Sequence, residues 1–226
     1  MLQKKALYLV AIHIGNEQDI TLRAIETLKN ADLVIGEERP STEKTLKRLG
    51  ITNKEIITLN EHNEKKEATE ILKYIMEKEI SAALISEAGT PCIADPGASL
   101  VNLFHKHNLK VIPIPGVSSI ITALMTSGII TEGFKYIGFL PANNEKRLTE
   151  LKKLSTEKLP IVILETPYRM KAILKDIHNT FGNNKQIVFA YKLTQPNELI
   201  IKSTISDIIT KTANLPKGEF VIVLLP

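Results

Sequence analysis

Short apolar runs alternate with longer segments of helical apolar spacing through the first half of the chain. The runs are typical of buried parallel strands, and the longer segments of amphipathic helices. Strands are predicted at residues 6–14, 32–36, 56–59, 82–85 and 109–114. The first helix is predicted to begin after a cap at Asp19 or Thr21 and to end at residue 31, and the second to begin after a cap at Ser41 and to end at residue 49. Two more helices are predicted at residues 67–78 and 98–107, and a polar link at residues 61–64. This alternation favours a mostly parallel sheet with right-handed crossovers.

The second half follows another order of elements. Helices are predicted at residues 117–127, 144–154, from about 170 to 181 and 206–212, and strands at 134–140, 160–165, 186–191, 199–203 and 220–225. Only a short gap separates the strands at 186–191 and 199–203, so they are predicted to form an antiparallel pair. We therefore predict an α/β protein of two domains, residues 1–114 with a mostly parallel sheet and residues 115–226 with a mixed sheet.

The stretch from Leu84 to Gly97 organises the first half. A buried strand leads into a loop with two glycines, two prolines and the carboxylates Glu87 and Asp95. In open α/β sheets, ligands bind beyond the carboxyl ends of the strands. A second Pro-Gly loop follows the strand that ends at Ile114. Two such loops predict one ligand crevice; the alternative is that the first is only a turn-rich connector.

Composition narrows the class of protein. The chain has 226 residues, of which 43% are hydrophobic and 24% charged, as in ordinary globular proteins. No apolar run approaches the roughly 18 residues that a membrane helix needs, and we expect no signal peptide. A single cysteine, Cys92, excludes an internal disulfide and fits a reducing compartment, so a cytoplasmic location is expected. The five histidines have no zinc-site spacing.

Charge is unevenly distributed along the chain. The net charge is +4; residues 1–114 carry 15 basic against 16 acidic residues, and residues 115–226 carry 14 against 9. A mildly basic second half is compatible with an anionic partner, and equally with a lysine-rich solvated surface. No dense basic tract and no tryptophan are present, so no stacking platform for nucleic acid is evident.

Several common motifs are missing from the sequence. It has no phosphate-binding Gly-x-x-x-x-Gly-Lys-Ser/Thr loop, no Gly-x-Gly-x-x-Gly after the first strand, and no Gly-x-Ser-x-Gly elbow. Kinase, dinucleotide-binding and esterase functions are therefore disfavoured. A crevice rimmed by small residues, backbone and carboxylates suits a cofactor with ribose hydroxyls and an ammonium group.

The order of the motifs resembles a known family. The motifs are Val10–Asn16, Gly36–Arg39, Leu59–Glu64, Ile85–Pro91, Asp95–Gly97, Pro113–Ser118, Gly138–Pro141, Glu165–Arg169 and Lys217–Phe220. Together they resemble the tetrapyrrole methylase family, in its branch of small-subunit ribosomal RNA methyltransferases. The resemblance implies S-adenosylmethionine as cofactor, two α/β domains with the cofactor in the cleft between them, and a homodimer. It also implies methylation of a cytidine ribose 2′-hydroxyl in small-subunit ribosomal RNA.

Site residues carried over by the resemblance come from both halves. The implied cofactor-binding residues are Glu87, Thr90, Ser118, Ser119, Thr166, Pro167, Ala190 and Tyr191. Leu164 and the segment 216–218 are expected to complete the adenosine pocket. Arg39 and Arg169 are the candidates for holding substrate phosphate; the alternative for Arg169 is an ion pair with Glu165.

The chain departs from the family pattern at several positions. Ile12-His13 replaces the usual Thr-Pro, and Glu37-Glu38-Arg39-Pro40 replaces Glu-Asp-Thr-Arg. Ala142-Asn143 stands where the family has Arg-Lys. Many members of the family also have a C-terminal extension, which we expect to be missing from this chain. Each lost phosphate contact should weaken RNA binding and its salt dependence.

A ribose hydroxyl is a poor nucleophile, so a nearby base would help the reaction. Glu38 is the preferred candidate base, and Glu37 and His13 are expected to face the same crevice; the alternative for each is an ordinary solvated loop side chain. Two alternatives to an RNA methyltransferase stay open. One is methylation of a small tetrapyrrole-like molecule, and the other is a protein that binds S-adenosylmethionine without catalysis.

Overall fold

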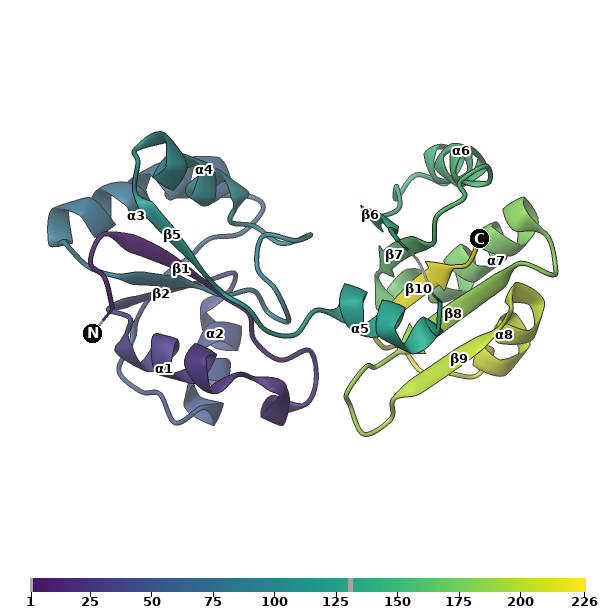
Figure 1. Ribbon diagram of the computed structural model, residues 1–226, viewed down its shortest axis with the longest axis horizontal. Coiled ribbons are helices and arrows are strands. Elements are labelled where there is room, and N and C mark those ends of the chain that lie inside the picture. Colours follow the sequence, from purple (N-terminus) through teal and green to yellow (C-terminus); the bar gives the residue numbers. More distant parts are fainter. Residues whose placement is uncertain (1, 130–131) are drawn as a thin grey trace. The chain divides into compact units, whose positions relative to one another are not determined.

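The chain forms two compact units, which we describe separately. A computed structural model describes residues 2–129 and 132–226, and it divides into unit 1, Met1–Ser118, and unit 2, Ser119–Pro226 (Figure 1). The division lies just beyond the boundary predicted after residue 114. Within the described residues no helix is long and apolar enough to cross a bilayer.

A five-stranded sheet forms the centre of unit 1, in the order β3-β2-β4-β1-β5. All of its neighbouring strands pair in parallel, as the alternating pattern predicted. The strands are β1 (Ala6–Val10), β2 (Leu33–Gly36), β3 (Glu55–Thr58), β4 (Ala82–Leu84) and β5 (Lys110–Ile114). Because the strands are parallel, their carboxyl ends lie at one edge of the sheet, where ligands bind in such folds.

Helices cover both faces of this sheet. Helices α1 (Leu22–Asn30) and α2 (Arg39–Arg48) pack on one face, and α3 (Glu64–Lys78) and α4 (Ala98–Lys106) pack on the other (Figure 1). Each face has its own apolar core, in which Leu28 and Ile12 lie on one side and Phe104 and Ile71 on the other. Burial of both faces explains why the strands read as continuous apolar runs.

Two helices begin three residues earlier than predicted. Helix α2 starts at Arg39, with Glu38 as its N-cap residue, so the predicted cap at Ser41 is wrong. Proline is favoured in the first turn of a helix, which allows the helix to include Pro40. Helix α3 starts at Glu64 rather than at Glu67, because a turn closed by the Asn60 side chain ends at Asn63.

Unit 2 contains a mixed sheet in the order β6-β7-β10-β8-β9. Strand β6 pairs with β7 in parallel, and the other pairs are antiparallel, including the predicted β8–β9 pair. The strands are β6 (Lys135–Phe139), β7 (Ile161–Glu165), β8 (Gln186–Tyr191), β9 (Leu199–Thr204) and β10 (Phe220–Leu224). Strand β10 is buried along its whole length and lies at the centre of the sheet.

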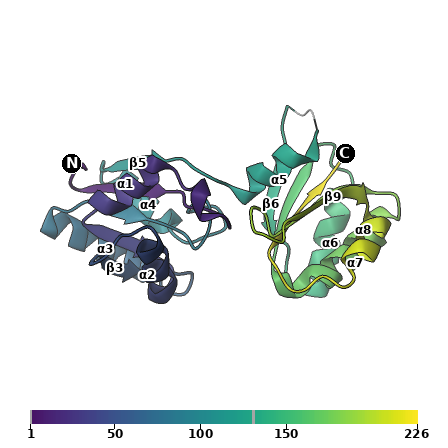
Figure 2. The same ribbon diagram turned by 90° about the horizontal axis from the view of Figure 1, so that it is seen from below.

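Helices α6 (Asn144–Leu154), α7 (Met170–Phe181) and α8 (Ile205–Thr212) cover one face of this sheet, and α5 (Ser119–Ser127) lies on the other (Figure 2). The main apolar core lies under α6, α7 and α8. A buried ion pair crosses this layer, where Arg147 Nε lies 2.8 Å from Asp176 Oδ2. Arg147 also donates to the carbonyls of Pro141 and Ala142, so it fixes the connection from β6 to α6.

Candidate functional site

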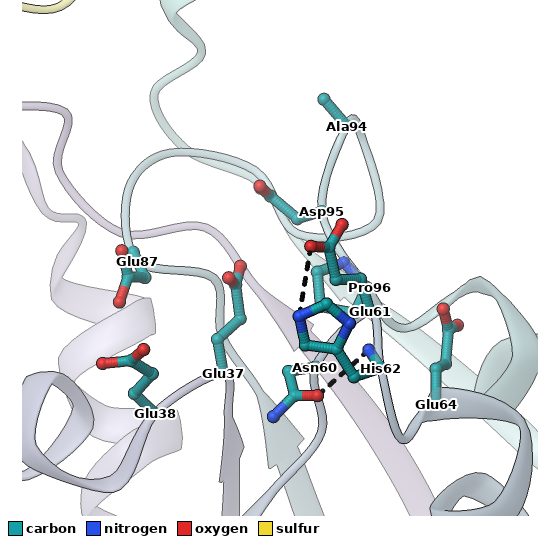
Figure 3. A pocket seen from close by; sticks show the side chains of 10 residues that line it. All are labelled: Glu37, Glu38, Asn60, Glu61, His62, Glu64, Glu87, Ala94, Asp95 and Pro96. Carbon is teal, nitrogen blue, oxygen red and sulfur yellow. Dashed lines mark hydrogen bonds and ion pairs between the residues drawn. The ribbon is translucent and has the colours of Figure 1, made fainter. Parts of the chain in front are cut away.

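A pocket of about 440 Å³ lies at the carboxyl edge of the unit 1 sheet. Its residues come from the loops after β2, β3 and β4, which are neighbouring strands (Figure 3). They are Glu37, Glu38, Asn60, Glu61, His62, Glu64, Glu87, Ala94, Asp95 and Pro96. Six of them are carboxylates, and neither lysine nor arginine is among them. The pocket therefore favours cationic or hydrogen-bond-donating groups over phosphate.

Backbone hydrogen bonds join the loops after β1, β4 and β5. The amide of Ile12 donates to the carbonyl of Gly89 at 2.9 Å, and the amide of Gly89 donates to the carbonyl of His13 at 3.1 Å. The Thr90 hydroxyl then donates to the carbonyl of Val117 at 3.1 Å. The two predicted loops therefore lie side by side, with the loop after β1 as a third member.

The loop from Glu87 to Gly97 is held in an unusual backbone conformation. Cys92 and Ala94 have φ values of +66°, which residues other than glycine rarely adopt. Gly97 has a φ of +129°. A Cβ atom on Gly97 would lie 2.6 Å from Leu84 Cδ2, so only glycine fits there. Such strain persists only where surrounding contacts hold it, and it often occurs at functional sites.

Glu64 supplies one of these contacts. Its Oε1 atom accepts hydrogen bonds from the amides of Gly97 at 3.0 Å and Ser99 at 2.8 Å, at the start of α4. These amides lack partners within their own helix, so a carboxylate from α3 caps α4. The cap fastens the end of the Glu87–Gly97 loop to the neighbouring helix.

Removing this cap should loosen the loop. We expect Glu64→Ala to lower the free energy of unfolding by about 1–2 kcal/mol, because two amides lose an acceptor. Glu64→Gln keeps one acceptor oxygen and should lose less. Hydrogen exchange of residues 86–99 measures the effect; unchanged exchange in Glu64→Ala would show that the cap does not hold the loop.

The carboxylates raise one another's pKa values. Burial raises the pKa of Glu37 to about 7, and the charges of Asp95, Glu87 and Glu38 add to this, while a hydrogen bond from the backbone of Glu87 opposes it. Burial also raises the pKa of Asp95 to about 6, with Glu87 adding and a hydrogen bond from Ser86 opposing. The Oε1 atom of Glu37 is buried and has no hydrogen-bond partner in the described part of the chain. These groups therefore titrate near neutral pH.

The structure brings together part of the predicted site in unit 1. Glu38 and Glu87 line the pocket, and Glu37 lies between them and Asp95 (Figure 3). Thr90 reaches the segment that precedes Ser118, through its bond to Val117. Ser119 is the first residue of α5 and belongs to unit 2. His13 joins the linked loops through its carbonyl but is not among the pocket residues.

Arg39 lies in a different environment from the pocket carboxylates. Its guanidinium donates to the carbonyl of Ile56 and forms an exposed ion pair with Glu43, with the Nη1 and Oε1 atoms 3.4 Å apart. The side chain thus covers the edge strand β3. Its predicted role in holding substrate phosphate stays a prediction.

Predicted residues of unit 2 also gather at one edge of their sheet. Glu165, at the end of β7, and Tyr191, at the end of β8, both pair with Phe220 of β10. Thr166 and Pro167 follow directly after β7, and Ala190 and Tyr191 end β8. Their common edge is consistent with one binding surface, but the predicted cofactor contacts stay predictions.

Arg169 forms the structural pair that the sequence left open as an alternative. Its Nε atom donates to Glu165 Oε2 at 2.8 Å, its Nη2 atom also bonds Glu165 Oε1, and Nη2 donates to the carbonyl of Leu140 at 2.7 Å. The Glu165 side chain is fully buried. The guanidinium therefore neutralises a buried carboxylate.

Sequence reasoning missed some of the pocket. The segment 61–64 was interpreted as a polar link, and Asn60 only as part of the Leu59–Glu64 motif. Asn60, Glu61, His62 and Glu64 nevertheless form the wall of the pocket after β3. Because these residues come directly after a predicted strand, the sequence could have placed them at the carboxyl edge of the unit 1 sheet. The described residues contain no group of three or more His, Cys, Asp or Glu placed to hold a metal ion.

Comparison with known proteins places the chain. A family model described as Tetrapyrrole (Corrin/Porphyrin) Methylases matches residues 6–209. The chain belongs to the tetrapyrrole methylase family. The predicted family and the predicted fold class are thereby confirmed.

Relatives within this family share much of the sequence. The chain is 39% identical to a protein of Synechocystis over 96% of this chain and 78% of that protein. It is 36% identical to a protein of Halalkalibacterium halodurans over 98% of this chain and 76% of that protein, and 37% identical to a protein of Haemophilus influenzae over 96% and 77%. All three are named ribosomal RNA small subunit methyltransferase I.

Solved structures of the family share the fold. A cobalt precorrin-4 methyltransferase of cobalamin biosynthesis aligns with a TM-score of 0.68 at 18% identity, over 98% of this chain and 95% of that chain. A uroporphyrin-III C-methyltransferase of Thermus thermophilus aligns with a TM-score of 0.66 at 16% identity, over 97% and 94%. At this identity the likeness shows the fold alone.

Proposed function

We propose that this chain is an S-adenosylmethionine-dependent methyltransferase that modifies small-subunit ribosomal RNA at the ribose 2′-hydroxyl of a cytidine. The observation that carries the proposal is the match, over nearly the whole chain, to relatives named ribosomal RNA small subunit methyltransferase I. The linked loops of unit 1 support it, because they present the implied cofactor residues at the ligand-binding edge of the sheet. We place the reaction in the cytoplasm.

The residues of unit 1 fit the proposed cofactor. S-adenosylmethionine carries a sulfonium and an ammonium group, and the acidic lining at Glu87 and Glu38 favours positive charge. The buried Oε1 of Glu37 is an acceptor that the described protein residues leave unsatisfied. We assign the cofactor to the linked loops with Glu87, Thr90 and Ser118 from unit 1, and with Thr166, Pro167, Ala190 and Tyr191 from unit 2.

The bound cofactor supplies a methyl group on a positively charged sulfur, and this sulfur becomes a neutral thioether when the methyl group is transferred. The protein's main task is then to hold the hydroxyl and the methyl donor in line. Glu38 is the candidate base from the sequence. Glu37 is a second candidate, because a base whose pKa is about 7 is well matched to neutral pH. Either would take the proton from the ribose hydroxyl.

Methyl transfer to ribosomal subunits tests the proposed substrate. Small subunits from a strain that lacks its own enzyme of this kind are incubated with the protein and radiolabelled S-adenosylmethionine. Label in a cytidine ribose is the expected result. Transfer only to a tetrapyrrole would replace RNA as the substrate, and cofactor binding without transfer to either would indicate a non-catalytic binding protein.

The cofactor assignment gives a prediction for Glu87. We expect Glu87→Lys to weaken S-adenosylhomocysteine binding by about 10-fold or more in calorimetric titration, because a cation replaces the carboxylate that would receive the ammonium group or the ribose hydroxyls of the ligand. Glu70→Lys makes the same charge change on the exposed face of α3, outside the pocket, and should leave binding unchanged. Equal affinities in the two variants would contradict the assignment.

The family resemblance also implies a homodimer, which we include in the proposal. Light scattering of the purified chain tests it directly. A mass of one chain at all concentrations would remove the dimer from the proposal and leave the chemistry as stated.

A further inference from the structure

Unit 2 carries an exposed aromatic ring with a lysine beside it and a second lysine on the neighbouring segment. Tyr168 lies in the short helical turn after β7, and 79% of its surface is exposed. The Nζ atom of Lys217 lies 4.5 Å from the centre of this ring. Lys192 lies beside the same segment, since its Cε atom would be 2.7 Å from a Cβ placed on Gly218. We call Tyr168, Lys192 and Lys217 the aromatic-basic platform.

The platform is built on fixed supports. The Tyr191 hydroxyl donates to the carbonyl of Pro216 at 3.0 Å, and the ring leaves no room for a Cβ on Gly218, which would lie 2.6 Å from Cε2. These contacts fix the segment that presents Lys217. On the other side, the Arg169–Glu165 pair anchors the turn that carries Tyr168. The ring is therefore exposed although its backbone is held.

The acidic pocket of unit 1 contrasts with the net positive charge of unit 2. Unit 1 presents six carboxylates in its pocket, which repel phosphate. Unit 2 contains 14 lysines and arginines against 9 acidic residues. A polyanion bound by this chain must therefore find its cationic contacts outside the pocket. The platform offers Lys217 over the Tyr168 ring, and Lys192, whose Nζ atom lies 5.5 Å from the centre of the neighbouring Tyr191 ring.

We propose that the aromatic-basic platform binds single-stranded RNA, with one base stacked on Tyr168 and adjacent phosphates held by Lys217 and Lys192. The choice of RNA rests on the proposed function. Single strands are bound by aromatic rings that stack on bases and by cations that follow the backbone. Lys217 covers one face of the Tyr168 ring and polarises it, and the exposed surface of the ring receives the base.

Binding of a fluorescein-labelled oligocytidine, followed by fluorescence anisotropy at low salt, tests the platform without requiring catalysis. We expect Tyr168→Ala to weaken binding by about 10-fold, the effect of losing one stacked base. Tyr168→Phe keeps the ring and should bind as the unmodified protein does. Unchanged hydrogen exchange in β7 and β10 would show that both variants remain folded.

Two further measurements separate the possible roles of Tyr168. S-adenosylhomocysteine affinity should be unchanged in Tyr168→Ala; a loss equal to the loss of RNA binding would overturn the proposal and place the cofactor's adenine on this ring. Lys217→Ala should reduce the slope of log affinity against log salt by about 0.7, the value for one phosphate contact on a single strand. Lys175→Ala, an exposed lysine on α7, should leave the slope unchanged.

The outcomes are distinguishable from failure of the proposed function. Oligocytidine binding that depends on Tyr168, together with no methyl transfer to small subunits, keeps the platform and rejects the proposed reaction. Methyl transfer with equal RNA affinity in Tyr168→Ala and the unmodified protein keeps the reaction and rejects the platform. Absence of any oligocytidine binding at low salt also rejects the platform.

Discussion

Replacing Arg169 with alanine is expected to destabilise unit 2 by about 3–5 kcal/mol, the usual result of removing one partner from a buried ion pair. Glu165 is fully buried, and Arg169 is its cationic partner. The guanidinium also bonds the carbonyl of Leu140. Alanine would therefore leave both a carboxylate and a carbonyl without this donor. Unit 2 should open more easily near the ends of β6 and β7.

Hydrogen exchange of the β7 and β10 amides measures this effect within unit 2, independently of unit 1. Lys211→Ala is the matched control, because Lys211 and Asp207 form an exposed ion pair with the same spacing along the chain. Exposed pairs contribute about 0.5 kcal/mol or less. The combined variant Arg169→Met with Glu165→Gln removes both charges and should recover part of the loss. Equal effects of Arg169→Ala and Lys211→Ala would show that the buried pair adds nothing.

Most of the fold was predictable, because its strands are buried on both faces or at the sheet centre. Continuous apolar runs such as Ala82–Leu84 and Phe220–Leu224 leave little ambiguity. The errors occurred at the ends of elements: the first strand was predicted to run to Ile14 but β1 ends at Val10, and two helices start three residues earlier than predicted. Glu38 caps α2 without a side-chain hydrogen bond, so no Ser, Thr, Asp or Asn signalled the start.

The site was predictable only in part. Glu87 follows closely after β4, and Asp95 lies in the same loop, which has the glycines and prolines that signal a shaped turn. The interaction of Glu64 with Gly97 and Ser99 joins residues more than thirty positions apart, which no local pattern reports. The role of Arg169 was likewise undecided, because the sequence does not show whether Glu165 points into the core. Such contacts depend on tertiary packing.

The aromatic-basic platform also depends on tertiary packing, so the sequence alone did not reveal it. Tyr168, Lys192 and Lys217 come from three separate segments, and each alone is an ordinary surface residue. The pairing of β7 and β8 with β10 brings their segments to one sheet edge. The absence of tryptophan and of a basic tract had therefore argued only against a continuous binding motif.

Replacing Glu37 with glutamine is expected to stabilise unit 1 above pH 7. The pKa of Glu37 is raised from 4.5 to about 7, so between these values the folded chain holds a proton that the unfolded chain has lost. Stability then falls as pH rises through this window, because ionisation is disfavoured in the folded state. The full shift corresponds to about 3 kcal/mol, which we reduce to about 1–2 kcal/mol because the side chain is partly exposed.

The sign of this effect is its sharpest test. Glutamine cannot ionise, so the stability difference between Glu37→Gln and the unmodified protein should be near zero below pH 4.5, grow up to about pH 7, and then stay constant. Calorimetric unfolding across this range measures it, with Glu26→Gln on the exposed face of α1 as control. A destabilised variant at high pH would mean that the ionised carboxylate has a stabilising partner. A stabilised variant in which methyl transfer is slowed about 100-fold would mean that the Glu37 carboxylate serves as the base. The charge that destabilises the folded chain would then be the charge that accepts the proton.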